Sequence, residues 1–171
     1  MSETPEERVM VSYLELTTAP MPPLAIARGE RIARETLTRA AYLALYRRVG
    51  GPLRWDTRLK LADAELDRLL SSTRLCLYVL RDSSGEAAGF CEFDREASPD
   101  VELKHFGLVP GAQGRGLGPW LLSTALCGEW EAGARRIWLH TDTWDHPAAV
   151  PVYLRAGFRV YDVRYEAVEG L

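Results

Sequence analysis

The sequence predicts a single α+β domain in which helices flank a mixed β-sheet. The chain has 171 residues, 47% of them apolar, which is enough for one hydrophobic core and short for two ordinary domains. Strand-like and helix-like segments are intermixed along it, without an internal repeat, and this order is typical of the class. We expect a flexible N-terminus over residues 1–8 and one domain over residues 9–171.

The first third of the chain contains a strand, a connector and a helix. Residues 9–16 alternate in the manner of a strand, and three prolines in residues 19–23 form a connector that neither a helix nor a central strand can continue. A second short extended segment is expected at residues 24–28. Apolar residues at helical spacing predict a helix over residues 34–49, which ends at the Gly-Gly-Pro of residues 50–52.

A helix and a hairpin follow. Residues 62–70 have apolar positions at helical spacing and acidic residues in their early turns. Residues 74–81 are typical of a strand, and the turn sequence of residues 82–85 leads into a return strand over residues 87–94. These features predict two antiparallel strands behind a short helix.

The last third alternates strands with helices. Residues 101–109 are rich in β-forming residues and predict a central strand. Glu102, Lys104 and His105 interrupt its apolar character, and polar residues in a central strand require an explanation. A glycine-rich loop leads to an apolar helix over residues 116–132, and a strand over residues 135–143 follows. We then expect a helix over residues 147–155 and a final strand over residues 158–167.

Charge and cysteine content restrict the possible partners and compartment. The net charge is −3 and 26% of the residues are charged, without a clustered basic surface, so binding to nucleic acid or to an anionic membrane is not expected. Cys76, Cys91 and Cys127 are odd in number and lie in apolar surroundings, which favours reduced buried thiols and a cytoplasmic location. We identify neither an export signal nor a membrane anchor.

Residues 109–118 contain four glycines and join the strand that ends at Val109 to the helix expected over residues 116–132. The first turn of a helix has unpaired N–H groups and a positive dipole end, and glycines allow a phosphate to approach both. Arg115 adds a formal positive charge. The run lacks the spacing of a P-loop and of a dinucleotide-binding fingerprint.

The run does fit Q/R-x-x-G-x-G/A, and with it the sequence resembles the GNAT superfamily of acyl-CoA-dependent N-acyltransferases. The resemblance implies a mostly antiparallel central sheet, acetyl-CoA as co-substrate and no metal. It also implies that the loop backbone holds the pyrophosphate of coenzyme A and that the preceding strand end binds the pantetheine arm. The loop residues are Gln113, Gly114, Arg115, Gly116, Leu117 and Gly118, and the strand-end residues are Leu108 and Val109.

A second segment is similar to the family pattern N-x-x-A-x-x-x-Y-x-x-x-G-F. His146 stands where asparagine is commoner, and Ala149 and Tyr153 occupy the Ala and Tyr positions. The resemblance implies that His146 and Ala149 lie beside the cofactor and that Tyr153 protonates the coenzyme A thiolate. The alternative for Tyr153 is a tyrosine that packs its ring in the core.

Glu102 is the candidate general base. It lies eleven residues before Gln113, a spacing at which members of the family carry a glutamate that deprotonates the amine. The alternative is a solvated strand residue or an ion-pair partner of Lys104. His105 is a weaker candidate, because in a regular strand it faces away from Glu102, although a bulge would undo that inference.

Two further groups of residues require an interpretation, a possible metal site and the tryptophans in predicted loops. His140, Asp142, Asp145 and His146 match no recognised metal-ligand spacing, so no metal site is expected. Two tryptophans in predicted loops, Trp55 and Trp144, either line an acceptor pocket or cap the core.

These observations predict a cytoplasmic N-acetyltransferase in which a small-molecule or peptide amine attacks acetyl-CoA directly, without a covalent enzyme intermediate. The rival from another class is a coenzyme A-binding sensor or assembly module without catalysis. Transfer of a longer acyl group and formation of a homodimer stay open. The acceptor itself is not encoded in any recognisable pattern.

Overall fold

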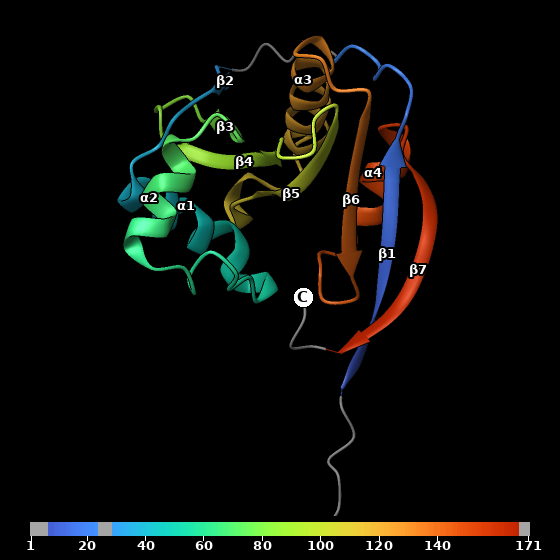
Figure 1. Ribbon diagram of the computed structural model, residues 1–171. Coiled ribbons are helices and arrows are strands. Elements are labelled where there is room, and N and C mark those ends of the chain that lie inside the picture. Colours follow the sequence, from blue (N-terminus) through green and yellow to red (C-terminus); the bar gives the residue numbers. More distant parts are fainter. Residues whose placement is uncertain (1–6, 24–28, 168–171) are drawn as a thin grey trace, which may run out of the picture.

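The computed structural model describes residues 7–23 and 29–167, so the segment at 24–28 and most of the expected flexible terminus lie outside it. Seven strands form one sheet in the order β2-β3-β4-β5-β6-β1-β7 (Figure 1). The strands are β1 (Arg8–Leu16), β2 (Arg31–Arg34), β3 (Leu75–Arg81), β4 (Ala87–Asp94), β5 (Asp100–Leu108), β6 (Arg136–Asp142) and β7 (Arg159–Ala167). The helices are α1 (Arg39–Gly50), α2 (Asp63–Ser71), α3 (Leu117–Glu131) and α4 (Ala149–Arg155), with 3₁₀ turns η1 (Gly51–Leu53) and η2 (Pro110–Ala112).

The predicted mixed, mostly antiparallel sheet is confirmed. Strands β5 and β6 run parallel, whereas the other five strand pairs are antiparallel. The β5–β6 ladder joins only residues 100–102 to residues 136–138. Beyond it, β5 keeps its pairing with β4 and β6 keeps its pairing with β1. The two strands therefore diverge, as Figure 1 shows, and the sheet separates into two halves.

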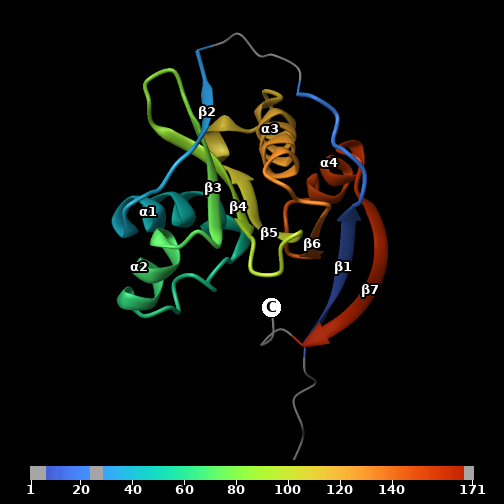
Figure 2. The same ribbon diagram turned by 45° about the horizontal axis from the view of Figure 1, so that its top comes forward.

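Helices cover the two faces of the β2–β5 half. On one face, the Tyr42 hydroxyl of α1 donates to Glu92 of β4. On the other face, the Tyr78 hydroxyl of β3 donates to Glu129 of α3 over 3.1 Å. Figure 2 shows α1 and α2 lying together, apart from α3. Core side chains on both faces are buried, among them Tyr46, Phe90, Phe93, Leu121, Leu122 and Leu126.

The N-terminal strand lies inside the sheet. β1 pairs with β6 and with β7, so that Val11 is opposite Asp142 on one side and Arg164 on the other. Its buried residues explain the alternating pattern that the sequence shows there, since side chains on successive positions point to opposite faces. The half of the sheet beyond β5 is thus built from the two ends of the chain.

The prediction of one helix over residues 34–49 is wrong at its start. Residues 31–34 instead form β2, which pairs with residues 78–81 of β3. The helix begins at Arg39, because the Thr38 side chain accepts a hydrogen bond from the Ala41 amide and caps the first turn. The other predicted helices and strands within the described residues lie within two residues of the observed elements.

The cysteines are free thiols, as expected, but their environments differ. Cys76 and Cys91 are buried, and Cys127 is partly exposed, contrary to its expected burial. Burial is the main cause that raises the pKa of the Cys76 thiol to about 11, so that this thiol is uncharged at neutral pH. Within residues 7–23 and 29–167, no helix has the length and apolar character needed to cross a membrane.

Candidate active site

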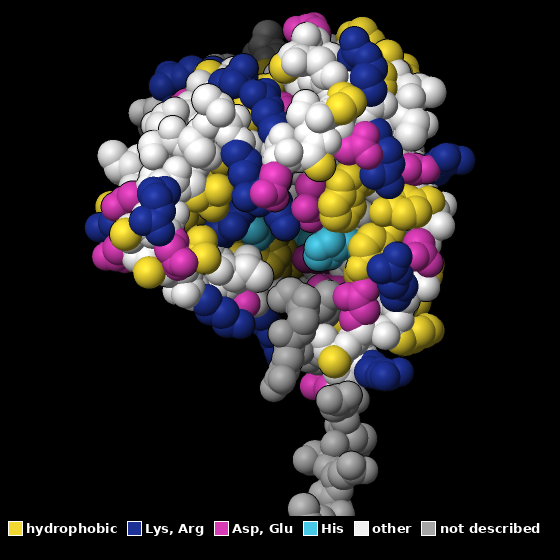
Figure 3. Space-filling model, in the orientation of Figure 1, with side chains coloured by type: hydrophobic (Ala, Val, Ile, Leu, Met, Phe, Trp, Pro, Cys, Tyr) yellow, Lys and Arg dark blue, Asp and Glu magenta, His cyan; other side chains and the backbone are white. Residues whose placement is uncertain are grey.

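A cavity of about 810 Å³ lies where β5 and β6 separate. Figure 3 shows the corresponding hollow in the surface, with histidine and apolar side chains in it. It is lined by β5, the glycine-rich loop, the start of α3, β6, the loop before α4, α4 itself, the end of α1 and the segment between α1 and α2. This volume suits a ligand of substantial size, and cavities with a few polar groups among apolar walls are the usual binding sites of enzymes.

The glycine-rich loop contributes one wall. Gly114 and Gly116 both have φ of +76°, a left-handed conformation that favours glycine, and Gly116 immediately precedes α3. A Cβ built on either glycine meets no other atom within 4 Å. The absence of side chains there therefore leaves space in front of the helix N-terminus, where unpaired N–H groups can bind an anion. The loop fits a pyrophosphate.

The other loop residues have separate environments. Gln113 lines the cavity and its side-chain amide donates to the Leu108 carbonyl over 3.3 Å. Arg115 forms an ion pair of 2.6 Å with Glu30. Leu117 is buried in the core and Gly118 lines the cavity. The Leu117 side chain thus anchors the loop in the core, and only the backbone of Leu117 is suited to contact a cofactor.

The end of β5 lies beside the loop. Leu108 lines the cavity, and its carbonyl accepts the Gln113 bond already described. The Val109 amide donates to the Ala88 carbonyl over 2.8 Å and so belongs to the sheet hydrogen bonding. The predicted contacts of Leu108 and Val109 with a pantetheine arm stay predictions.

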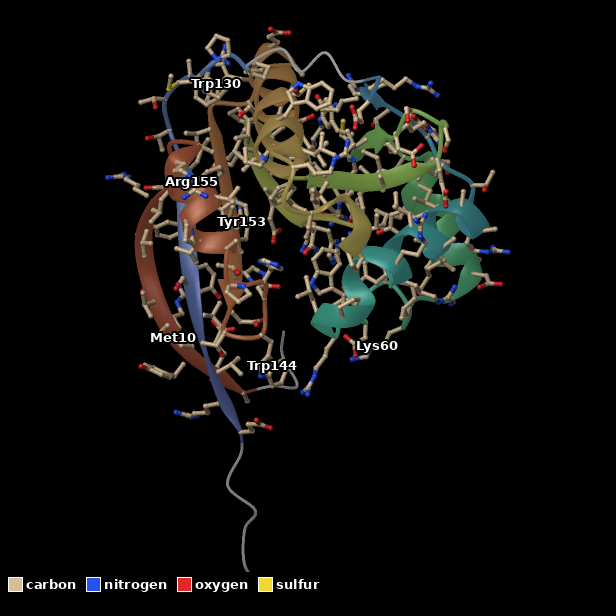
Figure 4. The ribbon with its side chains drawn as sticks, turned by 180° about the vertical axis from the view of Figure 1, so that it is seen from behind. Met10, Lys60, Trp130, Trp144, Tyr153 and Arg155 are labelled. Carbon is tan, nitrogen blue, oxygen red and sulfur yellow. The ribbon has the colours of Figure 1, made fainter. Side chains whose placement is uncertain are left out.

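Tyr153 occupies the centre of the site. Tyr153 is buried and lines the cavity, and its ring packs against Phe106 and Phe158. Figure 4 shows it on α4, on the side facing the space between the two halves. Its hydroxyl has no hydrogen-bond partner among the described residues. Burial, reinforced by the charge of Asp145, raises the pKa of Tyr153 well above its ordinary value, so the phenol keeps the proton that a general acid must donate.

His146 and Ala149 lie where α4 begins. Both line the cavity. The His146 Nδ1 accepts a hydrogen bond of 3.1 Å from the Ala148 amide, which closes a turn before the helix and delays its start to Ala149, two residues later than expected. The Nδ1 of His146 is thus occupied by a hydrogen bond within its own turn.

Glu102 forms an ion pair with Lys104 and lies near His140. Its carboxylate lies 3.2 Å from the Lys104 Nζ and 3.8 Å from the His140 Nε2. The side chain is half-buried, and Glu102 is not among the described residues that line the cavity, whereas Lys104 and His140 are. The alternative that pairs Glu102 with Lys104 is therefore realised, and its catalytic role stays a prediction.

A β-bulge changes the direction of His105. Phe93 is opposite Leu103 and Glu92 is opposite His105, which leaves Lys104 as an extra residue in β5. Glu102 is opposite Asp94, two positions from Glu92, so Glu102 and His105 project from the same face of the sheet. The expectation that they face opposite ways is wrong because the strand is not regular.

A buried polar network next to the cavity was not predicted. Glu92 is fully buried and accepts bonds from Tyr42 and from Arg58, whose Nε lies 3.0 Å away. His105 Nδ1 lies 3.3 Å from the same carboxylate. A lone acidic residue in the otherwise apolar strand sequence Ala-Ala-Gly-Phe-Cys-Glu-Phe was the available signal, since buried carboxylates require partners.

The two loop tryptophans flank the mouth of the cavity. The Trp55 Nε1 donates to Asp145 over 3.5 Å, and the Arg54 guanidinium lies 5.4 Å from the centre of the Trp144 ring. Both contacts join the segment after α1 to the loop before α4 across the cavity. Figure 4 shows Lys60 and Trp144 on opposite sides of this opening. Trp55 and Trp144 both line the cavity, which favours the acceptor-pocket hypothesis.

The histidines and aspartates considered as a metal site have other partners. Asp145 accepts bonds from Thr141 and from the Asp142 amide, and the Asp142 carboxylate accepts one from the Trp144 amide. In the part of the chain that the structure describes, no group of three metal-ligating side chains comes together.

Comparison with known proteins identifies the class. The pattern of the Acetyltransferase (GNAT) family matches residues 43–158. Because this is more than half of the chain, the protein belongs to the GNAT acetyltransferase family, a family of transferases. No curated protein matches the sequence.

Solved structures share the fold at low sequence identity. A GCN5-related N-acetyltransferase from Sphaerobacter thermophilus has a TM-score of 0.62 and 23% identity over 92% of this chain and 50% of its own. A tandem GNAT protein of the clavulanic acid biosynthesis pathway has a TM-score of 0.66 and 16% identity over 93% and 52%. The ribosomal-protein-S18-alanine N-acetyltransferase of Escherichia coli has a TM-score of 0.57 and 18% identity over 74% and 77%. The chain spans about half the length of the first two proteins.

Proposed function

We propose that this protein is an N-acetyltransferase that moves the acetyl group of acetyl-CoA to a primary amine. The observation that carries the proposal is one cavity with the open glycine loop in one wall and the Tyr153 side chain in another. The family supports acetyl-CoA as the donor. The acceptor, a small-molecule or peptide amine, enters from the side of Trp55 and Trp144.

The proposed reaction is a direct transfer. A neutral amine attacks the thioester carbonyl, the carbon–sulfur bond breaks, and Tyr153 donates its proton to the leaving thiolate. The nitrogen loses one proton as the amide forms, and this proton restores the Tyr153 phenol through water. The loop backbone of residues 113–118 holds the pyrophosphate, while Leu108, Val109, His146 and Ala149 lie beside the rest of the cofactor. Glu102, predicted from the sequence as the general base, is a candidate for removing the amine proton. A cytoplasmic location, resting on the three free thiols, is part of the same proposal.

An acceptor screen tests this function. Purified protein is incubated with acetyl-CoA and a library of amines, free thiol is measured, and products are identified by mass spectrometry. We expect an N-acetylated product with at least one amine, and no acetyl-enzyme when the acceptor is left out. A competent acetyl-enzyme would refute direct transfer, and parallel reactions with longer acyl-CoA donors decide the acyl length.

Replacement of Gly116 with valine tests the cofactor site. The added side chain projects into the space in front of α3, and a β-branched residue resists the φ of +76°. We expect acetyl-CoA to bind at least tenfold more weakly, a loss of about 1.4 kcal/mol or more. Calorimetry on folded protein measures the affinity.

Gly85→Val is the matched control. Gly85 also has a positive φ, of +87°, and open space around its Cβ, but it lies in the β3–β4 turn and is not among the cavity-lining residues. It therefore introduces similar backbone strain without obstructing the cofactor site. Equal affinities in the Gly116→Val and Gly85→Val proteins would remove the loop from the cofactor site.

A further inference from the structure

His105 lies between the cavity and the buried polar network around Glu92. It lines the cavity, its side chain is 11% exposed, and its ring packs against Trp55 with centroids 4.9 Å apart. Trp55 belongs to the mouth through which the acceptor enters in the proposed function. The imidazole therefore borders both the solvent-accessible cavity and the buried network behind it.

The two ring nitrogens have different partners. Nδ1 is buried, makes no aligned hydrogen bond and lies 3.3 Å from the Glu92 carboxylate. Nε2 lies 3.4 Å from the Tyr46 hydroxyl, which is 3.2 Å from Thr57, another cavity-lining residue. A carboxylate favours a hydrogen on the nitrogen that faces it, so Nδ1 carries the hydrogen and the lone pair is on Nε2. The Tyr46 hydroxyl has one hydrogen, and when it donates this hydrogen to Thr57, Nε2 can accept a proton.

Glu92 is an anion at neutral pH. Burial raises the pKa of its carboxyl, but the combined opposing effects of His105 and Arg58 are larger and lower the pKa. The Arg58 guanidinium is charged whether or not His105 carries a second proton. Arg58 holds the carboxylate through its Nε, and the Tyr42 hydroxyl holds the other oxygen. The orientation of this negative charge beside His105 is therefore fixed from two parts of the fold, α1 and the segment after η1.

We infer that His105 accepts the proton of the acceptor amine and that Glu92 is the positioning residue that orients its ring. The inference rests on the proposed acetyl transfer and names a base other than Glu102. Glu102 lies on the same face of β5 but has Lys104 and His140 as its contacts. His105 lines the cavity and has the Glu92 carboxylate beside its ring, an arrangement that suits a general base.

The proton balance is simple. An N–H bond of the acceptor ammonium breaks, its electron pair stays on the amine nitrogen, and the proton forms a new N–H bond at His105 Nε2. The imidazolium that results has the Glu92 carboxylate 3.3 Å from its Nδ1. The free amine then attacks the thioester carbonyl, the carbon–sulfur bond breaks, and Tyr153 gives its proton to the thiolate. The second proton that the nitrogen loses as the amide forms returns through water to the Tyr153 phenolate, and His105 releases its proton to solvent, so one proton is released for each ammonium that is acetylated.

Charged and titratable groups surround His105 on each side. Glu92 faces it from β4, Tyr46 from α1, and Arg58 lies on the far side of Glu92 in the segment after η1. Lys104 is its neighbour in β5. An effect of pH on the reaction must therefore be assigned by replacing His105 itself, and not from the pH profile of the parent protein alone.

The kinetic test compares two acceptors of the same skeleton at pH 7, an alkyl amine from the acceptor screen and the corresponding hydrazide. The alkyl amine is almost entirely protonated, since amines of its kind have a pKa near 10, whereas the hydrazide is neutral. We expect His105→Gln to lower kcat/KM for the alkyl amine about 10²-fold or more and to lower that for the hydrazide much less. The affinity for acetyl-CoA should be unchanged.

The variant Glu102→Gln tests the competing assignment. The inference would be overturned if Glu102→Gln lowered kcat/KM for the alkyl amine more than His105→Gln does and left kcat/KM for the hydrazide unchanged. Glu102 would then be the base. Equal losses for both acceptors in His105→Gln would also overturn it, because a merely structural histidine affects both alike. If the unmodified protein acetylates no amine, the proposed function itself is wrong. This result is obtained before any variant is made, so it is distinguished from failure of the His105 inference.

A measurement without turnover completes the test. The chain has three histidines, so ¹⁵N labelling of histidine and comparison with His105→Gln identifies the signals of this ring. We expect neutral His105 to carry its hydrogen on Nδ1, and Glu92→Gln, if it folds, to alter that preference. A hydrogen on Nε2 in the neutral ring would contradict the inference, since that nitrogen could not accept the proton.

Discussion

Replacement of Tyr153 with phenylalanine should lower the rate of the chemical step roughly 10²- to 10⁴-fold, the usual range for a positioned proton donor. The ring that packs against Phe106 and Phe158 stays in place. The barrier increases by about 3 to 5 kcal/mol, more than the roughly 0.5 to 1.5 kcal/mol of one ordinary stabilising hydrogen bond. The affinity for acetyl-CoA should hardly change.

The stability of Tyr153→Phe should also hardly change. This result distinguishes a general acid from a tyrosine whose role is to pack in the core. Its hydroxyl has no hydrogen-bond partner among the described residues, so its removal breaks no observed protein hydrogen bond. Single-turnover measurements at saturating substrates are needed, because slow product release can hide a loss in proton transfer. If folded Tyr153→Phe matches the parent rate, the thiolate leaves unprotonated or takes its proton from water.

Replacement of Glu129 with alanine should strongly lower the free energy of unfolding. Glu129 of α3 is only 1% exposed and accepts bonds from Arg95 at 2.7 and 2.8 Å. Without it, the partly buried Arg95 guanidinium loses its charge partner and the Tyr78 hydroxyl loses its acceptor. Removing one member of a buried pair costs about 3 to 5 kcal/mol, a large part of the roughly 5 to 15 kcal/mol that stabilises a typical domain.

Asp67→Ala is the control for this prediction. Asp67 of α2 also pairs with an arginine, Arg39, but its side chain is 54% exposed. An exposed pair contributes about 0 to 1 kcal/mol. Urea unfolding of both variants gives the two free energies, and losses of equal size would show that burial of the Glu129 pair does not matter. Glu129 is not among the cavity-lining residues, so turnover of the folded variant should be retained.

The glycine loop could be predicted from the sequence because its information is local. Gly114 and Gly116 need positive φ angles that side chains resist, and the spacing to α3 follows along a few adjacent residues. Tyr153 was placed by the same kind of short pattern. The helix and strand boundaries from residue 62 onwards also follow from local periodicity and turn residues, and they agree within two residues.

Features that depend on distant pairing could not be predicted. The start of α1 was misplaced because β2 exists only through its ladder with β3. The position of β1 between β6 and β7 has no local signal. The bulge at Lys104, which turns His105 toward Glu92, arises from the register of β4 against β5. Arg58 comes from an irregular segment, so its contact with Glu92 requires the complete fold.

The most direct test of the central claim is the release of thiol from acetyl-CoA in the presence of an amine library, with the product identified by mass spectrometry. The account predicts N-acetylation of at least one amine, with one coenzyme A released for each product. Tight binding of acetyl-CoA without turnover on any amine would contradict it and favour the sensor or assembly module, which has the same cofactor site but performs no transfer.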